Sequence, residues 1–341
     1  MRRTHLVLAI GLCLWSGAAL AQSEPEFTGS GDVPQGGGEA ERLLVEVEPE
    51  PLPIVGDDDF TMRDLTPDAL ASMFGTVERS ADGSVTELPA SPEVVNEFSS
   101  SGTTESSETT TDRVVLGADE RERIWDASGF PFRVVGYLSI QRDAEHWAGC
   151  SGALIGPRTV LTAGHCVWKP TMGDGWPVTL TFAPGSNSPD YAPYGRIPYQ
   201  RIHVVSGFID SYTPDNYTMA AVATDLAVIT LQSPIGDDLG WLGYMSDPAD
   251  GFDAHILGYP GDKPDETMWR ADCSVAPGDK LELYMHHYCD TYSGTSGGPM
   301  YWVNPEGKRY IRGINVGGQK TRNLALRLTS GYCAWVKERR Q

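Results

Sequence analysis

The sequence lacks an excess of basic residues, and after residue 21 it lacks any apolar run long enough to cross a bilayer. A membrane-spanning helix needs about 20 consecutive apolar residues, and a nucleic-acid-binding surface needs clustered Lys and Arg. The 341 residues instead contain 26 Lys and Arg against 46 Asp and Glu, a net charge of −20. We therefore expect no stable membrane insertion and no nucleic-acid partner.

The six cysteines include no Cys-x-x-Cys pair, so the usual spacings of structural zinc sites are missing. Cys273, His286 and Cys289 are close enough in sequence to surround a metal, but a disulfide beside a surface histidine fits these residues better. We expect neither a metal nor a cofactor.

The first 21 residues have the pattern of a secretory signal peptide. Arg2 and Arg3 precede a mostly apolar stretch from Leu6 to Leu20, and Ala19-Leu20-Ala21 is a small-x-small cleavage site. The alternative, a membrane anchor, would need a longer apolar run. The pattern predicts secretion to an extracellular or periplasmic location, where disulfides form.

Most of the negative charge lies between the signal peptide and the folded part. Residues 22–112 hold 21 acidic residues against three arginines, with few aromatic residues and tracts such as SSSGTTESSETTTD. Such a composition buries too little apolar surface to offset the entropy of the chain. Residues 22–113 are therefore predicted to be a mostly disordered acidic propeptide or linker, with one possible short helix at 64–74. The alternative is a solubilising arm without a regulatory role.

Residues 114–341 have the short β-branched and aromatic runs, separated by Gly, Pro and Asp turns, that are typical of all-β proteins. Helical periodicity is clear only near the end, at 330–340, with Ser330 as a plausible N-cap. About ten strands over some 200 residues indicate two closed sheets, because closure removes exposed edges. The predicted strand segments are 132–141, 152–163 (two strands), 177–184, 196–205, 225–232, 252–260, 266–276, 281–289, 300–318 (a hairpin) and 324–329.

The sequence GTSGGP at 294–299 places Ser296 between glycines. It fits both the nucleophile elbow of α/β-hydrolases and the nucleophile loop of chymotrypsin-like peptidases. In the α/β-hydrolases a histidine follows the serine, but no histidine follows Ser296 in this chain. His165 and Asp225 stand upstream instead, in the order histidine, aspartate, serine that chymotrypsin-like enzymes use.

Five motifs resemble the chymotrypsin-fold serine endopeptidases of the V8-like, glutamyl-endopeptidase branch. The resemblance covers most of the folded part, from about Gly117 to Arg327. It implies two six-stranded antiparallel β-barrels at about 130–235 and 250–328, followed by a helix at about 330–340. The motifs are CSGALIGPRTVLTAGHC (150–166), DLAVITL (225–231), GYPGDK (258–263), CDTYSGTSGGP (289–299) and GINVGG (313–318).

The resemblance also implies catalytic roles that fit the residue types. Ser296 would be the nucleophile, His165 its base, and Asp225 the group that fixes the imidazole tautomer. The N–H groups of Gly294 and Ser296 would form the oxyanion hole. Asp210 or Asp215 could replace Asp225 as the acid. The remaining histidines lack this motif context and are expected to be structural or exposed: His146, His203, His255, His286 and His287.

Substrate specificity is where this chain departs from the resemblance. Glutamyl specificity in that branch uses a histidine where this chain has Asn315, next to Val316 and Gly317 in the expected substrate-binding strand. Thr291 fits the other pocket position, and Asp290 matches by count the acid that gives trypsins their basic preference. We expect that cleavage after Glu is not the dominant activity.

Activation departs from the resemblance as well. Thr295 stands where many relatives have the aspartate that pairs with a new N-terminus, so activation cannot use that ion pair. VVLGADER (114–121) resembles the mature start of V8-like enzymes, which places the boundary near Arg113.

Two disulfides are expected, Cys150–Cys166 around the histidine and Cys273–Cys289 before the nucleophile loop. Cys333 is left over, and is either buried and free or used to link another molecule; otherwise we expect a monomer.

The sequence therefore predicts a secreted serine endopeptidase acting on protein or peptide substrates. The alternatives are a catalytically silent binding protein on the same fold, or an esterase with the same triad.

Overall fold

The structure is a computed structural model. It describes residues 62, 65–100, 115–213, 216–319 and 321–341. The chain divides after Leu44, and all of the described residues belong to the second unit, 45–341. The predicted signal peptide, residues 22–61 and the expected boundary at Arg113 lie outside the described residues.

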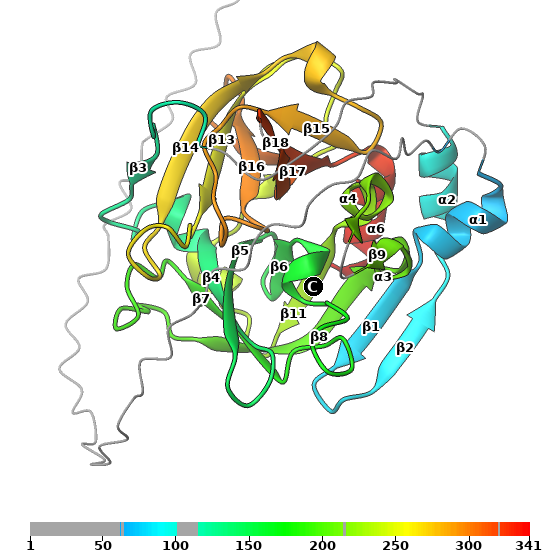
Figure 1. Cartoon of the computed structure of the whole chain (residues 1–341), viewed down its shortest axis with the longest axis horizontal. Helices are drawn as coiled ribbons and strands as arrows, with labels where there is room; N and C mark the ends of the chain where they lie inside the picture. Colours follow the sequence, from blue (N-terminus) through cyan, green and yellow to red (C-terminus); the bar gives the residue numbers. More distant parts are fainter. Residues whose placement is uncertain (1–61, 63–64, 101–114, 214–215, 320) are drawn as a thin grey trace, which may run out of the picture. The chain divides into compact units, whose positions relative to one another are not determined.

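The first half of the folded part is a closed barrel of six antiparallel strands (Figure 1). Its strands follow in the order β11-β6-β5-β4-β7-β8, and pairing of β8 with β11 closes the ring. Closure satisfies the backbone groups of what would otherwise be two edge strands. The strands are β4 (Val135–Gln141), β5 (Trp147–Leu154), β6 (Thr159–Thr162), β7 (Thr179–Pro184), β8 (Ile197–Val205) and β11 (Ala227–Leu231).

The second half contains a six-stranded antiparallel sheet in the order β15-β18-β17-β16-β13-β14, with two short strands added to it. The Cys273–Cys289 disulfide joins β14 to the residues that follow β15, so it links the two ends of this six-strand path. The strands are β13 (Phe252–Gly258), β14 (Trp269–Val275), β15 (Tyr284–His287), β16 (Pro299–Val303), β17 (Arg309–Gln319) and β18 (Arg322–Arg327), with β3 (Glu122–Arg123) and β12 (Gly243–Tyr244) at the margins.

The predicted terminal helix is α6 (Ser330–Arg339). Its N-cap is Thr329, one residue before the expected Ser330, and the Thr329 side chain accepts a hydrogen bond from the N–H of Tyr332. The backbone of Thr329 is still extended, as a cap residue requires. The all-β fold with a C-terminal helix is confirmed.

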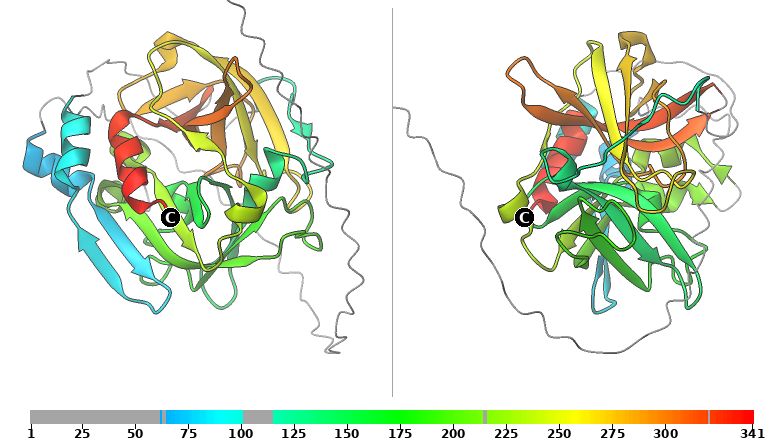
Figure 2. Two further views of the ribbon diagram at one scale, coloured as in Figure 1. Left: turned by 180° about the vertical axis from the view of Figure 1, so that it is seen from behind. Right: turned by 90° about the vertical axis from the view of Figure 1, so that its left-hand side faces the viewer.

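Residues 65–100 correct the prediction of a mostly disordered acidic segment. They form α1 (Pro67–Met73), β1 (Thr76–Ser80), β2 (Val85–Leu88) and α2 (Pro92–Ser99), here called the N-terminal module. Average composition hid this module, because its few large buried apolar side chains, Leu70, Phe74, Val77, Val94 and Phe98, are outnumbered by polar and exposed residues. Figure 2 shows α2 lying beside α6. Of the predictions for 22–113, only the short helix at 64–74 matches an element of this module.

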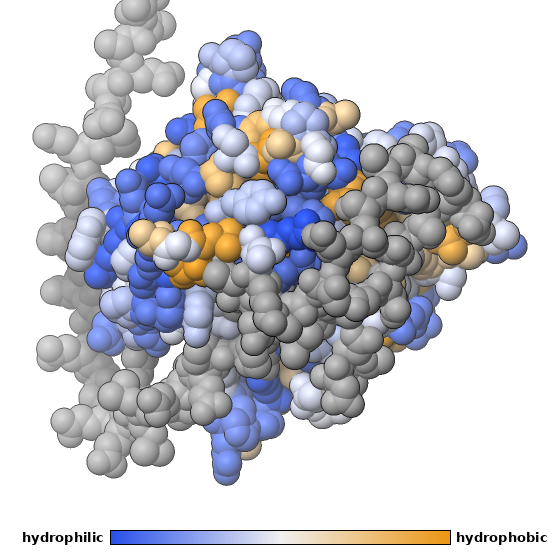
Figure 3. Space-filling model, turned by 45° about the horizontal axis from the view of Figure 1, so that its top comes forward, coloured by the Kyte–Doolittle hydropathy of each residue, from blue (hydrophilic) through white to orange (hydrophobic). Residues whose placement is uncertain are grey.

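The apolar side chains form two buried clusters. The larger includes residues of the first barrel, the N-terminal module and α6, and the smaller lies within the second sheet. On the face seen in Figure 3, polar residues predominate and apolar residues gather in smaller patches. No helix in the described ranges is long and apolar enough to span a membrane.

Short helices in the loop before β11 were not predicted. The chain forms α3 (Ser206–Ser211) after β8, then the small hairpin of β9 (Tyr212–Thr213) and β10 (Asn216–Tyr217), and then α4 (Met219–Thr224). Each is too short to show a helical or strand period in the sequence. A further short helix, α5 (Gly236–Leu239), follows β11.

Candidate active site

Two neighbouring strands of the first barrel bring His165 and Asp225 together. β6 pairs with β11 so that Thr162 lies opposite Ala227. The chain leaves β6 into the 3-10 turn Gly164–Cys166, which carries His165, and β11 begins two residues after Asp225, the C-cap of α4. In an antiparallel pair the end of one strand lies beside the start of the other, so these two residues meet at one edge of the barrel.

The two side chains are buried and in direct contact. Asp225 Oδ2 lies 2.6 Å from His165 Nδ1, and Asp225 Oδ1 accepts the backbone N–H of His165 at 2.8 Å. A carboxylate facing Nδ1 favours the tautomer with the proton on Nδ1, which leaves Nε2 able to accept one. Within the described part of the chain, Nε2 of His165 has no hydrogen-bond partner. The imidazole is therefore oriented as a base.

The loop that carries Ser296 lies against the start of the histidine turn. A Cβ atom on Gly297 would come within 2.1 Å of Thr162 Oγ1 and 3.1 Å of the backbone nitrogen of Ala163. Ala163 immediately precedes the turn of His165, so only glycine lets the serine loop approach this closely. The structure thus brings the buried Ser296 next to the segment that carries His165.

The backbone of the serine loop has the conformation that an oxyanion site needs. Gly294 has φ +90°, and a Cβ atom there would lie 2.3 Å from the carbonyl oxygen of Tyr259. The Ser151 hydroxyl donates to the carbonyl of Gly294 at 2.7 Å and fixes this peptide. Among the described residues, the N–H groups of Gly294 and Ser296 donate to no other group, so both are available to an oxygen of a ligand.

Asn315 lies on β17 beside this loop and contacts a histidine that sequence reasoning had set aside. The Asn315 backbone exchanges hydrogen bonds with the Gly297–Gly298 segment, at 2.8 and 3.0 Å. β15 and β17 flank β18, and His287 of β15 reaches across it to place Nε2 3.2 Å from Asn315 Oδ1. Burial lowers the pKa of His287 to about 3, with the neighbouring His286 adding to the effect. His287 is therefore neutral near pH 7.

A neutral His287 donates its Nε2–H to Asn315 Oδ1, which turns the amide so that Nδ2 is the free end. Asn315 Nδ2 and Thr291 Oγ1 are buried, and among the described residues neither has a hydrogen-bond partner. Val316 is the bulged residue between Asn315 and Gly317, where β17 shifts register against β18. Bulges of this kind redirect side chains beside active sites. The predicted pocket residues thus supply neutral donors.

Asp290 has a different environment from the one its position in the sequence suggested. Its two carboxylate oxygens accept the backbone N–H groups of Leu116 and Glu120, at 2.7 and 2.9 Å. Nearby, the buried Arg121 pairs with Asp119 and Asp262. Asp290 therefore anchors the backbone at the start of the peptidase part, and we withdraw it as a substrate-binding candidate.

Comparison with known sequences decides the family. The sequence profile of the Trypsin family matches residues 126–329, a range that contains all three candidate catalytic residues. The chain belongs to the trypsin family.

Two bacterial relatives and one solved structure place this trypsin-family chain among proteases. A Bacillus subtilis (strain 168) protein described as an extracellular metalloprotease is 35% identical over 222 residues, covering 63% of this chain and 66% of that protein. A glutamyl endopeptidase of Bacillus licheniformis is 34% identical over 189 residues, covering 55% of this chain and 54% of the relative. The chain thus spans less than two thirds of either relative. The structure of a Glu endopeptidase in complex with MPD matches with a TM-score of 0.57 and 25% identity, over 66% of this chain and 99% of that one.

Both predicted disulfides of this trypsin-family chain form. Cys150–Cys166 joins β5 to the histidine turn, and Cys273–Cys289 precedes the serine loop. Each pair has a histidine within 4.8 Å, His165 for the first and His287 for the second. A disulfide sulfur is no longer a thiolate and cannot bind a metal as one, so we propose no metal at either group.

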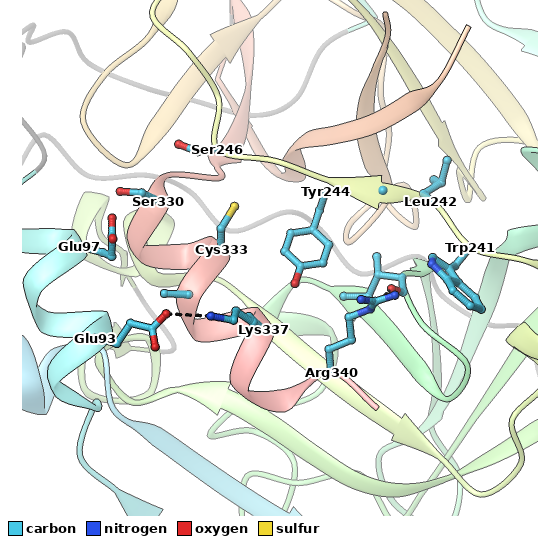
Figure 4. Close-up of a pocket in the computed structure, with 13 residues that line it drawn as sticks. Glu93, Glu97, Trp241, Leu242, Tyr244, Ser246, Ser330, Cys333, Lys337 and Arg340 are labelled. Carbon is cyan, nitrogen blue, oxygen red and sulfur yellow. Dashed lines mark hydrogen bonds and ion pairs between the residues drawn. The ribbon is translucent and has the colours of Figure 1, made fainter. Parts of the chain in front are cut away.

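Cys333 is the free cysteine of the described residues. It lines a cavity of about 500 Å³ between α2, α6 and the segment around Tyr244 (Figure 4). Burial raises the pKa of its thiol to about 12, and Glu97 adds to the effect. The thiol is therefore protonated at neutral pH and is a weak nucleophile, which argues against a ready intermolecular link.

Tyr217 is a site residue that sequence reasoning missed. Its hydroxyl donates to Asp225 Oδ2, the oxygen that also faces His165 Nδ1. The buried ring stands edge-on to the imidazole, with centroids 6.2 Å apart. No sequence motif marked Tyr217. Its contact with Asp225 forms only because α4, which lies between the two positions, brings the chain back beside Tyr217.

Changing Tyr217 to Phe should lower peptide turnover roughly tenfold, the cost of one hydrogen bond to a buried charge. Loss of the donor removes a hydrogen bond that fixes Asp225 Oδ2, so the carboxylate orients the imidazole less firmly. Tyr212→Phe is the control: Tyr212 packs on Tyr217 at 5.8 Å, but among the described residues its hydroxyl makes no bond to Asp225. Equal turnover in the two variants would contradict the role of Tyr217.

Proposed function

We propose that this trypsin-family chain is a secreted serine endopeptidase that hydrolyses peptide bonds through His165, Asp225 and Ser296. The observation that supports this most directly is the buried contact between His165 Nδ1 and Asp225 Oδ2, at 2.6 Å, beside the loop of Ser296. A free serine hydroxyl is a weak nucleophile, and an imidazole held in this tautomer is the group that activates it.

In the first half of the reaction, Ser296 Oγ attacks the carbonyl carbon of the scissile bond while His165 Nε2 accepts the hydroxyl proton. The oxygen that becomes negative would be bound by the N–H groups of Gly294 and Ser296. The C–N bond then breaks, and His165 transfers its proton to the leaving amine. The product is an ester between Ser296 and the acyl part of the substrate.

In the second half, a water takes the place of the amine. His165 Nε2 accepts a proton from the water as its oxygen attacks the ester carbonyl, and returns that proton to Ser296 Oγ as the ester breaks. Asp225 stays ionised throughout and stabilises the imidazolium that forms twice in the cycle. No cofactor enters these steps.

We further propose that the chain is made with a pro-segment, residues 22–113, followed by the peptidase part 114–341, and that the enzyme acts outside the cytoplasm as a monomer. The signal-like residues 1–21, the acidic composition of 22–112 and the two disulfides support this. Thr295 cannot form the ion pair with a new α-amino group that many relatives use, so activity should not depend on one fixed N-terminal residue.

Incubation with a mixed peptide library, with cleavage sites read by mass spectrometry, tests the proposed reaction. Internal cuts by the wild-type protein and none by Ser296→Ala would support an endopeptidase. Turnover of activated esters without any peptide cleavage would favour an esterase. Absence of both reactions would favour a silent binding protein on this fold.

The buried side chains of Asn315 and Thr291, near Ser296 in the fold, suggest a preference for uncharged polar side chains. Asn315 Nδ2 and Thr291 Oγ1 are neutral donors, and His287 is neutral because burial lowers its pKa to about 3. A substrate carboxylate would lose its hydration there without meeting a full positive charge, which is costly. A glutamine side chain would meet the same donors without that cost.

We therefore expect kcat/KM for a Gln substrate to match or exceed that of the Glu substrate near pH 7, so that cleavage after Glu is not dominant. Because a Glu side chain has an ordinary pKa of about 4.3, a falling pH neutralises it. The ratio of Glu to Gln cleavage should then rise between pH 7 and pH 5. Matched substrates with Glu, Gln, Lys, Arg and Leu before the cut measure this; a hundredfold preference for Glu at pH 7 would show that another residue supplies positive charge.

A further inference from the structure

The N-terminal module, residues 65–100, completes the edge of a barrel strand. β8 uses one edge for two partners: Pro198 and Ile197 pair with β7, and residues 201–205 pair with β1. Its other edge pairs with β11. Without β1, the second half of β8 would present unpaired backbone groups, which natural sheets cover or shorten. Through β1, the module is thus a part of the first sheet.

The module also fills an aromatic seam on α6. The rings of Phe74 and Phe98 stack at 3.6 Å, and Tyr332 of α6 meets both edge-on, at 5.8 and 5.0 Å. All three side chains are buried. A Cβ atom on Gly331 would lie 2.6 Å from three ring atoms of Phe98, so the glycine in α6 makes room for this ring. The seam is packed as closely as the interior of a single domain.

Polar contacts fix the register of the module on the peptidase part. Trp335 Nε1 donates to the carbonyl of Gly75 at 3.2 Å, and the Arg339 guanidinium donates to the Thr76 hydroxyl. The buried His203 of β8 places Nε2 2.9 Å from Glu78 Oε2 in β1. Trp335, Thr76 and His203 are buried, so solvent competes little with these contacts.

The same module supports the helix that ends at Asp225. The Tyr332 hydroxyl donates to the carbonyl oxygen of Ala223 in α4. A Cβ atom on Gly207 of α3 would lie 2.8 Å from Met73 of the module and 3.1 Å from Thr224. Loss of the module would therefore expose the seam and remove packing from α3 and from Tyr332, the two neighbours through which it supports α4.

We propose that the N-terminal module stays bound to residues 115–341 after the chain is cut between them, on a docking surface made of the free edge of β8 and the aromatic face of α6. The processed enzyme is then a complex of two fragments. Cleavage near Arg113 breaks the chain between them, but they remain in contact. The binding part of the proposal is independent of the catalytic role of Ser296.

The test uses the full chain in which Ser296→Ala prevents self-cleavage and a recognition site for a specific protease replaces residues 103–110. After complete cutting, the two fragments should elute together in one peak at micromolar concentration, in equal amounts by mass spectrometry, and should separate only in denaturant. Elution of the module fragment by itself under native conditions would overturn the proposal.

Two variants show whether the seam is the docking surface. Phe98→Ala removes the ring that packs on Gly331 and should raise the dissociation constant of the cut pair roughly a hundredfold, as expected for deletion of a buried aromatic side chain. Leu88→Ala is the matched control, because Leu88 lies in β2 of the same module and is 50% exposed. It should change the constant less than threefold. Equal retention of both variants would contradict the assignment of this surface.

A second readout rests on the proposed peptidase function. With Ser296 intact, the cut pair should keep its peptide hydrolysis, and the cut Phe98→Ala pair should lose it on dilution while Leu88→Ala does not. Dissociation of the module without loss of activity would overturn the link to Asp225, and separation of the two cut fragments in the first experiment would overturn docking whatever the activity.

Discussion

Replacement of Ser296 by Ala is expected to reduce peptide hydrolysis by about a millionfold, the usual scale of a triad nucleophile knockout. The loss is large because no other group can form the ester intermediate. The fold should be unaffected, since the change removes one hydroxyl from a loop whose shape is set by its backbone. Gly297 and Gly298 exchange hydrogen bonds with Asn315, and none of these involves the Ser296 side chain.

Ser293→Ala is the control for this change, because it removes a hydroxyl three residues earlier in the same loop. It should retain at least about a tenth of wild-type turnover. Both variants should unfold at the wild-type temperature within a few degrees. A Ser296→Ala protein that keeps a tenth of wild-type activity would refute the proposed nucleophile, whatever its stability.

Replacement of Asp225 by Asn is expected to cost about ten-thousandfold in turnover near neutral pH. The Asn amide can place its NH₂ group against His165 Nδ1, which would then be the unprotonated nitrogen. Nε2 would carry the proton and could no longer accept one from Ser296. The amide also carries no charge to stabilise the imidazolium.

Asp210→Asn is the matched control, because Asp210 was the other described candidate for the acid. It is exposed at the end of α3, and its loss should leave turnover within about threefold of wild type. The third candidate, Asp215, lies outside the described residues. A greater loss in Asp210→Asn than in Asp225→Asn would reverse the assignment.

The closed barrel and the second sheet were predictable because their strands are short, apolar and separated by strong turn signals. The run DLAVITL predicted β11, and the Asn-Pro-Glu-Gly turn at 304–307 predicted the β16–β17 hairpin. His165, Asp225 and Ser296 were identifiable because each lies within a short motif whose spacing carries the chemistry. The match to the Trypsin family confirms the resemblance that those motifs indicated.

The rest depends on contacts between distant segments, which no local pattern encodes. His287 meets Asn315 only because β15 and β17 both flank β18. Asp290 has the sequence offset of a pocket acid, yet its oxygens bind the backbone of residues 116 and 120.

The N-terminal module was missed for a related reason. Its buried apolar residues join the core cluster of the first barrel and α6, while the acidic residues around them dominate the average composition. Phe98 lies in an otherwise polar stretch, and its burial follows from a partner, Tyr332, more than 230 residues later in the chain.

Covalent labelling with a fluorophosphonate tests the central claim most directly, because the reagent reacts only with a serine hydroxyl that an adjacent base has activated. Peptide mapping by mass spectrometry should find one label per chain, on Ser296. Labelling should disappear in Ser296→Ala and should fall steeply in His165→Ala, while Ser293→Ala is labelled normally. A label on a different residue, or peptide cleavage by a protein that no fluorophosphonate modifies, would contradict the account.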